Sequence, residues 1–184
     1  IYIYPIPDYL LYQGRDMTVQ SCPYSIYSAE IVVPKLLRKH SIYQKDIHKA
    51  STFLVPHFTT CFYHLCIESH LKSIDGCKLD AANYLQKILE WVDSHHMFMS
   101  SNGGSDHALV FSWDRGAELV KGNLELSLLL KNMTHLVHYG YSNSMVENMP
   151  NNYIAIPPYR KPEECVDSEK SVLAYFRGTF IDDY

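Results

Sequence analysis

Short apolar runs alternate along the chain with longer segments whose apolar residues recur at helical spacing. Runs of four to eight residues rich in β-branched and aromatic side chains are typical of strands, particularly where proline or glycine ends them. Such runs occupy residues 1–4, 53–55, 107–113, 134–140, 152–156 and 171–176. The pattern therefore predicts a sheet of several short, mostly buried strands.

The segments between these runs predict helices. Residues 79–95 form the clearest one, because their apolar residues repeat every three to four positions. Residues 28–40 predict a second helix, with Ser28 as its cap and Pro34 causing either a kink or a later start. Residues 59–73 favour a helix that ends in a turn at Asp75-Gly76, and residues 124–130 favour another.

The alternation of strands and helices indicates an α/β domain whose mostly parallel sheet is covered on both faces. Ligands of such sheets bind at the carboxyl ends of the strands. Those ends are where the unusual residues of this sequence fall: Pro56-His57, Asp114-Arg115-Gly116, residues 157–160 and Arg177-Gly178. The carboxyl edge is therefore the predicted place for a site.

Size and charge limit the class of protein. The 184 residues provide for one domain with a sizeable core, or one domain and the beginning of another. A net charge of -4 lacks the basic stripe that nucleic-acid binding needs, so no nucleic-acid partner is expected. No apolar run reaches membrane-spanning length, and the chain begins at Ile1 without a signal peptide, so we expect any anchor to lie outside it.

Cysteine usage and one modification motif point toward the secretory route. Five cysteines are compatible with one or two disulfides, but their spacing does not define the pairing, and the odd number leaves at least one unpaired. Asn132-Met133-Thr134 is an N-glycosylation sequon. Both features are consistent with a lumenal protein without establishing it.

Residues 100–116, "SSNGGSDHALVFSWDRG", are the most informative segment for chemistry. Gly103 and Gly104 lie in a flexible turn that allows a backbone to approach a ligand closely. Asp106 and His107 follow directly, and an Asp beside a His is suited to act as a general base or to hold a hydroxyl group. Asp114 comes at the end of the predicted strand. The alternative is that Asp106 caps the turn while His107 packs against the sheet.

The segment "GGSDHALVFSWDRG" resembles the signature of the exostosin family, in which two glycines and an Asp-His pair lead into a strand ending in Asp and Gly. Other segments are similar to family motifs in the same order. They are "IYIYPIP" for the opening strand, "YSAE" for a Tyr-x-x-Glu helix, "DIHKASTFLVPHF" for an Asp turn and Phe-x-Val-Pro strand, "YIAIPPY" before a linker, and "SVLAYFRGTF" for the first strand of a second domain. The resemblance covers nearly the whole chain.

This resemblance implies a Rossmann-like, three-layer α/β domain over residues 1–160, followed at 161–184 by a linker and the first strand of a second Rossmann-like, nucleotide-sugar domain. It implies a GT-B glycosyltransferase that transfers a sugar from a nucleotide sugar to a glycan acceptor, without a cofactor or an obligatory metal. Asp106 and His107 are then the expected catalytic residues. Gly103, Gly104, Asp114 and Arg160 are the expected substrate-binding residues, and Arg177 and Gly178 the donor-side residues.

The resemblance also implies residence in the Golgi or endoplasmic reticulum lumen as a type II membrane protein, and it leaves a homodimer or heterodimer open. Because the donor domain is only begun at Tyr184, we expect this chain alone to be inactive. A non-catalytic carbohydrate-binding or scaffold module of the same fold is the alternative. The sequence lacks the Gly-x-Ser-x-Gly elbow of hydrolases, the dinucleotide fingerprint after the first strand and a second cysteine pair at zinc spacing.

Overall fold

The computed structural model describes residues 1–13, 22, 25–96, 102–113, 116–120, 122–138 and 152–157. The strands are β1 (Tyr2–Ile3), β2 (Phe53–Leu54), β3 (His107–Phe111), β4 (Thr134–Val137) and β5 (Asn152–Ala155). The α-helices are α1 (Asp8–Leu11), α2 (Ala29–Leu37), α3 (Thr59–Glu68), α4 (Ile74–His96) and α6 (Leu124–Leu130). Short 3-10 turns η1 (Ser25–Ser28), η2 (Ile47–Lys49) and η3 (Gly116–Val120) complete the described elements.

The strands form one five-stranded sheet in the order β1-β2-β3-β4-β5, and every neighbouring pair is parallel. The predicted α/β class and parallel sheet are confirmed, and the architecture is Rossmann-like. The predicted strand at 171–176, at the start of a second domain, lies outside the described residues.

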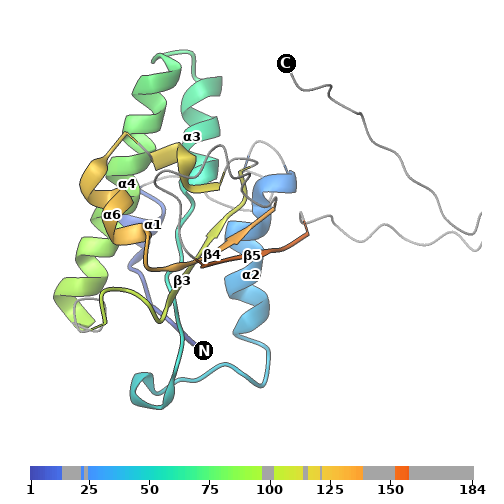
Figure 1. The fold of residues 1–184 in the computed structure, drawn as a ribbon. Coiled ribbons are helices and arrows are strands. Elements are labelled where there is room, and N and C mark those ends of the chain that lie inside the picture. Colours follow the sequence, from blue (N-terminus) through green and yellow to red (C-terminus); the bar gives the residue numbers. More distant parts are fainter. Residues whose placement is uncertain are drawn as a thin grey trace, which may run out of the picture.

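Alternating side chains place the sheet between two helical layers, because successive residues of a strand point to opposite faces. Tyr4, Phe53 and Leu109 face the layer of α1, α3, α4 and α6 within the main core. The neighbouring residues Leu54 and Ala108 pack against α2 on the other face. Figure 1 shows α2 on one side of the sheet and α1, α4 and α6 on the other.

Several predicted helix limits change in the structure. The turn predicted at Asp75-Gly76 is wrong, since both residues lie inside α4 and the chain turns earlier, between α3 and Ile74. The Ser73 hydroxyl, which accepts a hydrogen bond from the Gly76 N–H at 3.1 Å, fixes that earlier start. The predicted capping role of Ser28 is also wrong, because its buried hydroxyl makes no cap hydrogen bond to α2.

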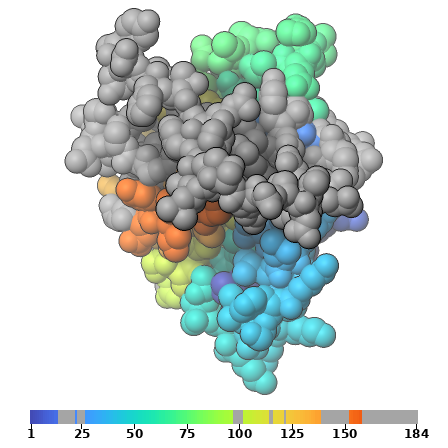
Figure 2. Space-filling model, turned by 90° about the vertical axis from the view of Figure 1, so that its right-hand side faces the viewer, coloured from blue at the N-terminus to red at the C-terminus, as the bar shows by residue number. Residues whose placement is uncertain are grey.

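Strand β5 lies at the edge of the sheet and differs from the others in burial. All four of its residues are exposed, whereas all five residues of β3 are buried. Tyr153 and Ile154 are 45% and 56% exposed. Figure 2 shows β5, in orange, at the molecular surface.

Candidate functional site

Polar networks occupy both ends of β3. Asp106 and His107 stand at its amino end, and Ser112 follows its carboxyl end. Five residues of extended chain at about 3.3 Å each separate the two ends by about 17 Å. The two networks are therefore distinct sites rather than parts of one.

The amino-end network joins four side chains, and in it the Asn102 Nδ2 donates to Asp106 Oδ2 at 2.8 Å. The His107 Nδ1–H donates to Asp106 Oδ1 at 2.7 Å, since a carboxylate only accepts. The other ring nitrogen, Nε2, is then an acceptor and receives the hydroxyl of Tyr4 at 2.8 Å. Burial lowers the pKa of His107, although Asp106 acts in the opposite direction. The imidazole is therefore neutral, with its tautomer fixed by Asp106.

In this structure protein groups enclose the His107 ring, while Asp106 stays partly exposed. Its imidazole has no exposed surface, while the side chain of Asp106 retains 20% exposure. Both ring nitrogens are occupied by protein groups, and the residue lies at the amino end of its strand, where the sequence predicted it. His107 has no face available to a ligand in this structure, and Asp106 only a narrow one.

The predicted turn before β3 is confirmed, and the structure explains why glycine occupies positions 103 and 104. Gly103 and Gly104 have φ angles of 56° and 79°, in the left-handed region that favours glycine. A Cβ on Gly104 would lie 3.0 Å from the Cε of Met133, so this glycine also allows close packing against the turn before β4. The close approach observed is to the protein's own side chain.

At the carboxyl end, Glu30 connects three elements. This residue of α2 is 1% exposed. Its carboxylate accepts hydrogen bonds from the Thr60 N–H at 3.0 Å and from the Ser112 N–H at 3.3 Å, and also contacts the Thr60 hydroxyl. These contacts join α2 to the start of α3 and to the end of β3.

Glu30 caps α3 from a distant part of the chain. The N-cap residue of α3, Phe58, offers no side-chain acceptor, so the free N–H of Thr60 would otherwise be unsatisfied. Burial raises the pKa of Glu30 to about 8, although its hydrogen-bond donors lower it. The sequence contained no signal for this contact, because Thr59 and Thr60 at the start of α3 are themselves residue types suited to capping.

Two buried histidines contact the last residue of β3. His57, just after β2, and His135, in β4, both pack against Phe111, with ring centroids 5.1 and 5.0 Å away. Burial lowers the pKa of His57 to about 3 and that of His135 to about 4. Within the described part of the chain, His57 Nε2 and His135 Nδ1 have no hydrogen-bond partner. Both rings are neutral.

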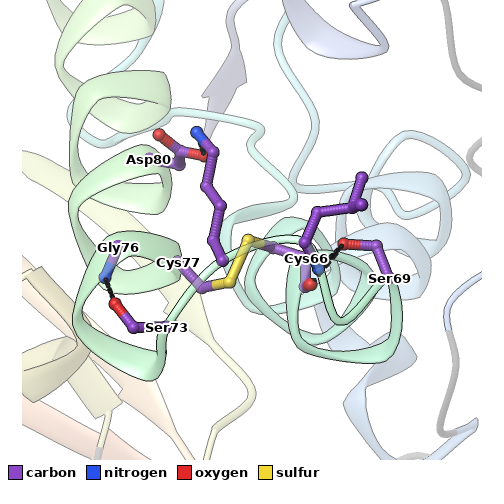
Figure 3. A network of polar contacts seen from close by, with 8 residues as sticks. Cys66, Ser69, Ser73, Gly76, Cys77 and Asp80 are labelled. Atoms are coloured by element: carbon purple, nitrogen blue, oxygen red, sulfur yellow. Dashed lines mark hydrogen bonds and ion pairs between the residues drawn. A yellow bond between two sulfur atoms is a disulfide. The ribbon is translucent and has the colours of Figure 1, made fainter.

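A cavity of about 590 Å³ lies between α3 and α4, next to the residues that follow β1 and α1. Phe62, Leu65 and Tyr84 supply apolar surface within it. Its polar lining residues are Gln13, Ser69, Lys72, Asp80, Asn83 and Lys87. Lys72 and Asp80 form an exposed ion pair at 2.6 Å beside the Cys66–Cys77 disulfide (Figure 3).

Two disulfides fix the position of α3. Cys22 pairs with Cys61, and Cys66 pairs with Cys77. Their sequence separations of 39 and 11 residues correspond to roughly 3 to 4 kcal/mol of stabilisation each through loss of freedom in the unfolded chain. Cys165 lies outside the described residues. No helix among the described segments has the length and apolar character needed to cross a bilayer.

The structure brings Gly103, Gly104, Asp106 and His107 together in one turn at the amino edge. Four other predicted site residues, Asp114, Arg160, Arg177 and Gly178, lie outside the described residues. Sequence reasoning missed the role of Tyr4 and the capping role of Glu30.

The chain belongs to the exostosin GT47 family, because the Exostosin GT47 domain matches residues 1–184. This agrees with the parallel α/β domain that the structure shows. The resemblance inferred from the Gly-Gly-x-Asp-His segment is thereby confirmed.

Curated relatives come from plants. A probable glucuronoxylan glucuronosyltransferase of Arabidopsis thaliana is 25% identical over 97% of this chain and 39% of its own length. A probable glucuronosyltransferase of Oryza sativa subsp. japonica is 24% identical, covering 99% of this chain and 44% of the relative. A probable beta-1,4-xylosyltransferase of Arabidopsis thaliana is 24% identical over 88% of this chain and 39% of its own length. The chain thus spans about two fifths of these relatives. No solved structure matches it significantly.

Proposed function

We propose that this chain is the acceptor-side half of a glycosyltransferase that transfers a sugar from a nucleotide sugar to a glycan acceptor. The observation that carries the proposal is the match of the exostosin GT47 domain to the whole chain. The plant relatives named as glucuronosyl- and xylosyltransferases support transfer of a uronosyl or pentosyl unit. The remaining length of those relatives supports a donor-binding second domain beyond these residues.

In this proposal the acceptor hydroxyl loses a proton as it attacks the anomeric carbon, and the nucleoside diphosphate leaves. A general base near the cleft assists the first event, and positive charge or N–H groups stabilise the second. We propose that Asp114, Arg160 and Arg177 contribute to these two events. For His107 we propose that it positions Asp106 and Tyr4 rather than transferring a proton, because its two ring nitrogens already bind these residues.

The cavity between α3 and α4 is the proposed acceptor contact. It is lined by α3, the helix that follows the carboxyl end of β2, and ligands of parallel sheets bind near such ends. Its mixture of amide, hydroxyl and charged groups with aromatic surface suits a sugar, which presents hydroxyl groups around apolar ring faces. Lys87 supplies a cation that would favour an acidic glycan.

We propose residence in the lumen of the endoplasmic reticulum or Golgi, with the complete enzyme anchored as a type II membrane protein by a segment outside these residues. The two disulfides support this location, since such bonds form and persist in oxidising compartments.

The test of activity compares the complete enzyme with this chain alone on a panel of nucleotide sugars and xylan-type acceptors. We expect turnover by the complete enzyme and none by the chain alone, because the chain spans about two fifths of its relatives and the proposed donor domain belongs to the remainder. Steady turnover by the chain alone would overturn the two-domain division. Glycan binding without turnover by the complete enzyme would instead support a carbohydrate-binding module.

The acceptor contact is tested by Lys87→Ala in the complete enzyme. We expect the acceptor KM to rise roughly tenfold, which corresponds to one charge-assisted hydrogen bond of about 1.4 kcal/mol, while kcat changes little. Lys78→Ala is the matched control, since Lys78 lies on α4 outside the cavity lining. Equal acceptor KM values for both variants would exclude this cavity.

A further inference from the structure

We propose that Asn132 carries an N-linked glycan, which marks the amino edge of the sheet as the surface facing away from the catalytic cleft. Asn132-Met133-Thr134 is the only Asn-x-Ser/Thr triplet with a non-proline middle residue in the 184 residues. The assignment rests on the surroundings of this triplet in the structure and on the disulfides.

The side chains of the triplet are arranged as an accessible acceptor needs. Asn132 is exposed on the turn between α6 and β4, where Met133 is fully buried and holds the turn in place. The Asn132 Nδ2 donates to the Gly103 carbonyl oxygen at 3.3 Å. An amide carries two N–H groups, and glycosylation consumes one, so the other retains this contact.

The covalent step has a defined balance. The amide nitrogen attacks C1 of an oligosaccharide held on a polyprenyl diphosphate, which is the lumenal donor of the secretory pathway. The N–C1 bond forms, the C1–O bond to the diphosphate breaks, one amide proton is released, and the lipid diphosphate leaves. The two disulfides independently support an oxidising compartment, where this modification occurs.

The location of the glycan has a consequence for the cleft. Asn132 touches Gly103 in the turn before β3, beside the Asp106–His107 network at the amino edge. A bulky hydrated glycan there prevents a second domain from packing against this edge. The donor domain must then face the carboxyl edge, where Glu30 joins the ends of β3 and the start of α3.

The experiment expresses the full-length protein in a eukaryotic secretory host and examines the tryptic peptide containing Asn132 by mass spectrometry before and after peptide N-glycosidase treatment. We expect a glycopeptide that the enzyme converts to a peptide with Asp at this position. Asn132→Gln and Thr134→Ala should each abolish the modification, while Thr134→Ser, which preserves the sequon, should retain it.

An unmodified Asn132 peptide from secreted wild-type protein with its disulfides formed would overturn the proposal, even if an Asn132 variant failed to fold. Removal of the glycan from the folded, active enzyme tests whether the amino edge of the sheet faces away from the catalytic cleft. We expect kcat to change less than twofold, and a large change would contradict the assignment of this edge to the outer surface. The modification is measured without any transferase assay, so its failure is distinguishable from failure of the proposed activity.

Discussion

Glu30→Ala should lower the free energy of unfolding of this chain by roughly 3 to 5 kcal/mol, because it leaves two buried N–H groups, those of Thr60 and Ser112, without an acceptor. It also removes the cap of α3 and the connection of α2 to β3. Urea denaturation followed by circular dichroism measures the loss. The control is Glu68→Ala, at the exposed end of α3, where we expect a change within about 0.5 kcal/mol. A loss below about 1 kcal/mol for Glu30→Ala would contradict the capping role.

Glu30→Gln tests the same carboxylate through pH. Burial raises the folded-state pKa of Glu30 to about 8 from an ordinary value of 4.5, so the folded chain holds a proton that the unfolded chain releases between these values. Stability from this group is therefore complete below pH 4.5 and is lost as pH rises toward 8. Between pH 6.5 and 8 we expect wild-type stability to fall by roughly 1 to 2 kcal/mol, with a flatter profile for the glutamine variant. Parallel profiles would refute the protonated state.

The second large effect is expected from His107→Ala. It removes the ring that connects Tyr4 to Asp106 and leaves a buried void, so unfolding free energy should fall by roughly 2 to 4 kcal/mol. Under conditions in which the variant is folded, kcat of the complete enzyme should change less than about tenfold, because the ring has no open face. If His107 transferred a proton in the reaction, or did so together with Asp106, the variant's kcat would instead fall by a factor of roughly 10² or more.

Asp106→Asn separates the two roles further. An asparagine oxygen can still accept from the His107 Nδ1–H, so the contact that orients His107 survives, while the carboxylate and its second acceptor, which binds the Asn102 amide, are lost. Normal kcat in this variant supports positioning, and a loss of 10² or more with intact stability would return Asp106 to catalysis.

The sequence predicted the fold well because periodicity reports local burial. The apolar runs at β2 and β3 and the helical repeat of α4 each reflect side chains that face one core. The helix limits were less predictable, since a serine hydroxyl rather than Asp75-Gly76 fixed the start of α4.

The site was harder to predict because its contacts join distant residues. Glu30 and Ser112 lie 82 positions apart, and Tyr4 and His107 lie 103 apart, separations that no local pattern encodes. Residue type identified Asp106 and His107 as chemically capable, and chain order placed them before the strand. Their low accessibility depends on tertiary burial, which periodicity describes only by face.

Because two disulfides attach to α3, oxidative folding of this protein requires the correct choice among alternative cysteine pairings. Cys61 and Cys66 belong to one helix, so each must find its own partner, Cys22 or Cys77, while its neighbour competes for the same thiol. Four cysteines allow three pairings, and only one permits the native placement of this helix. In a reducing cytosol these disulfides would not form. A host with an oxidising compartment and a disulfide isomerase is therefore the appropriate source of the protein.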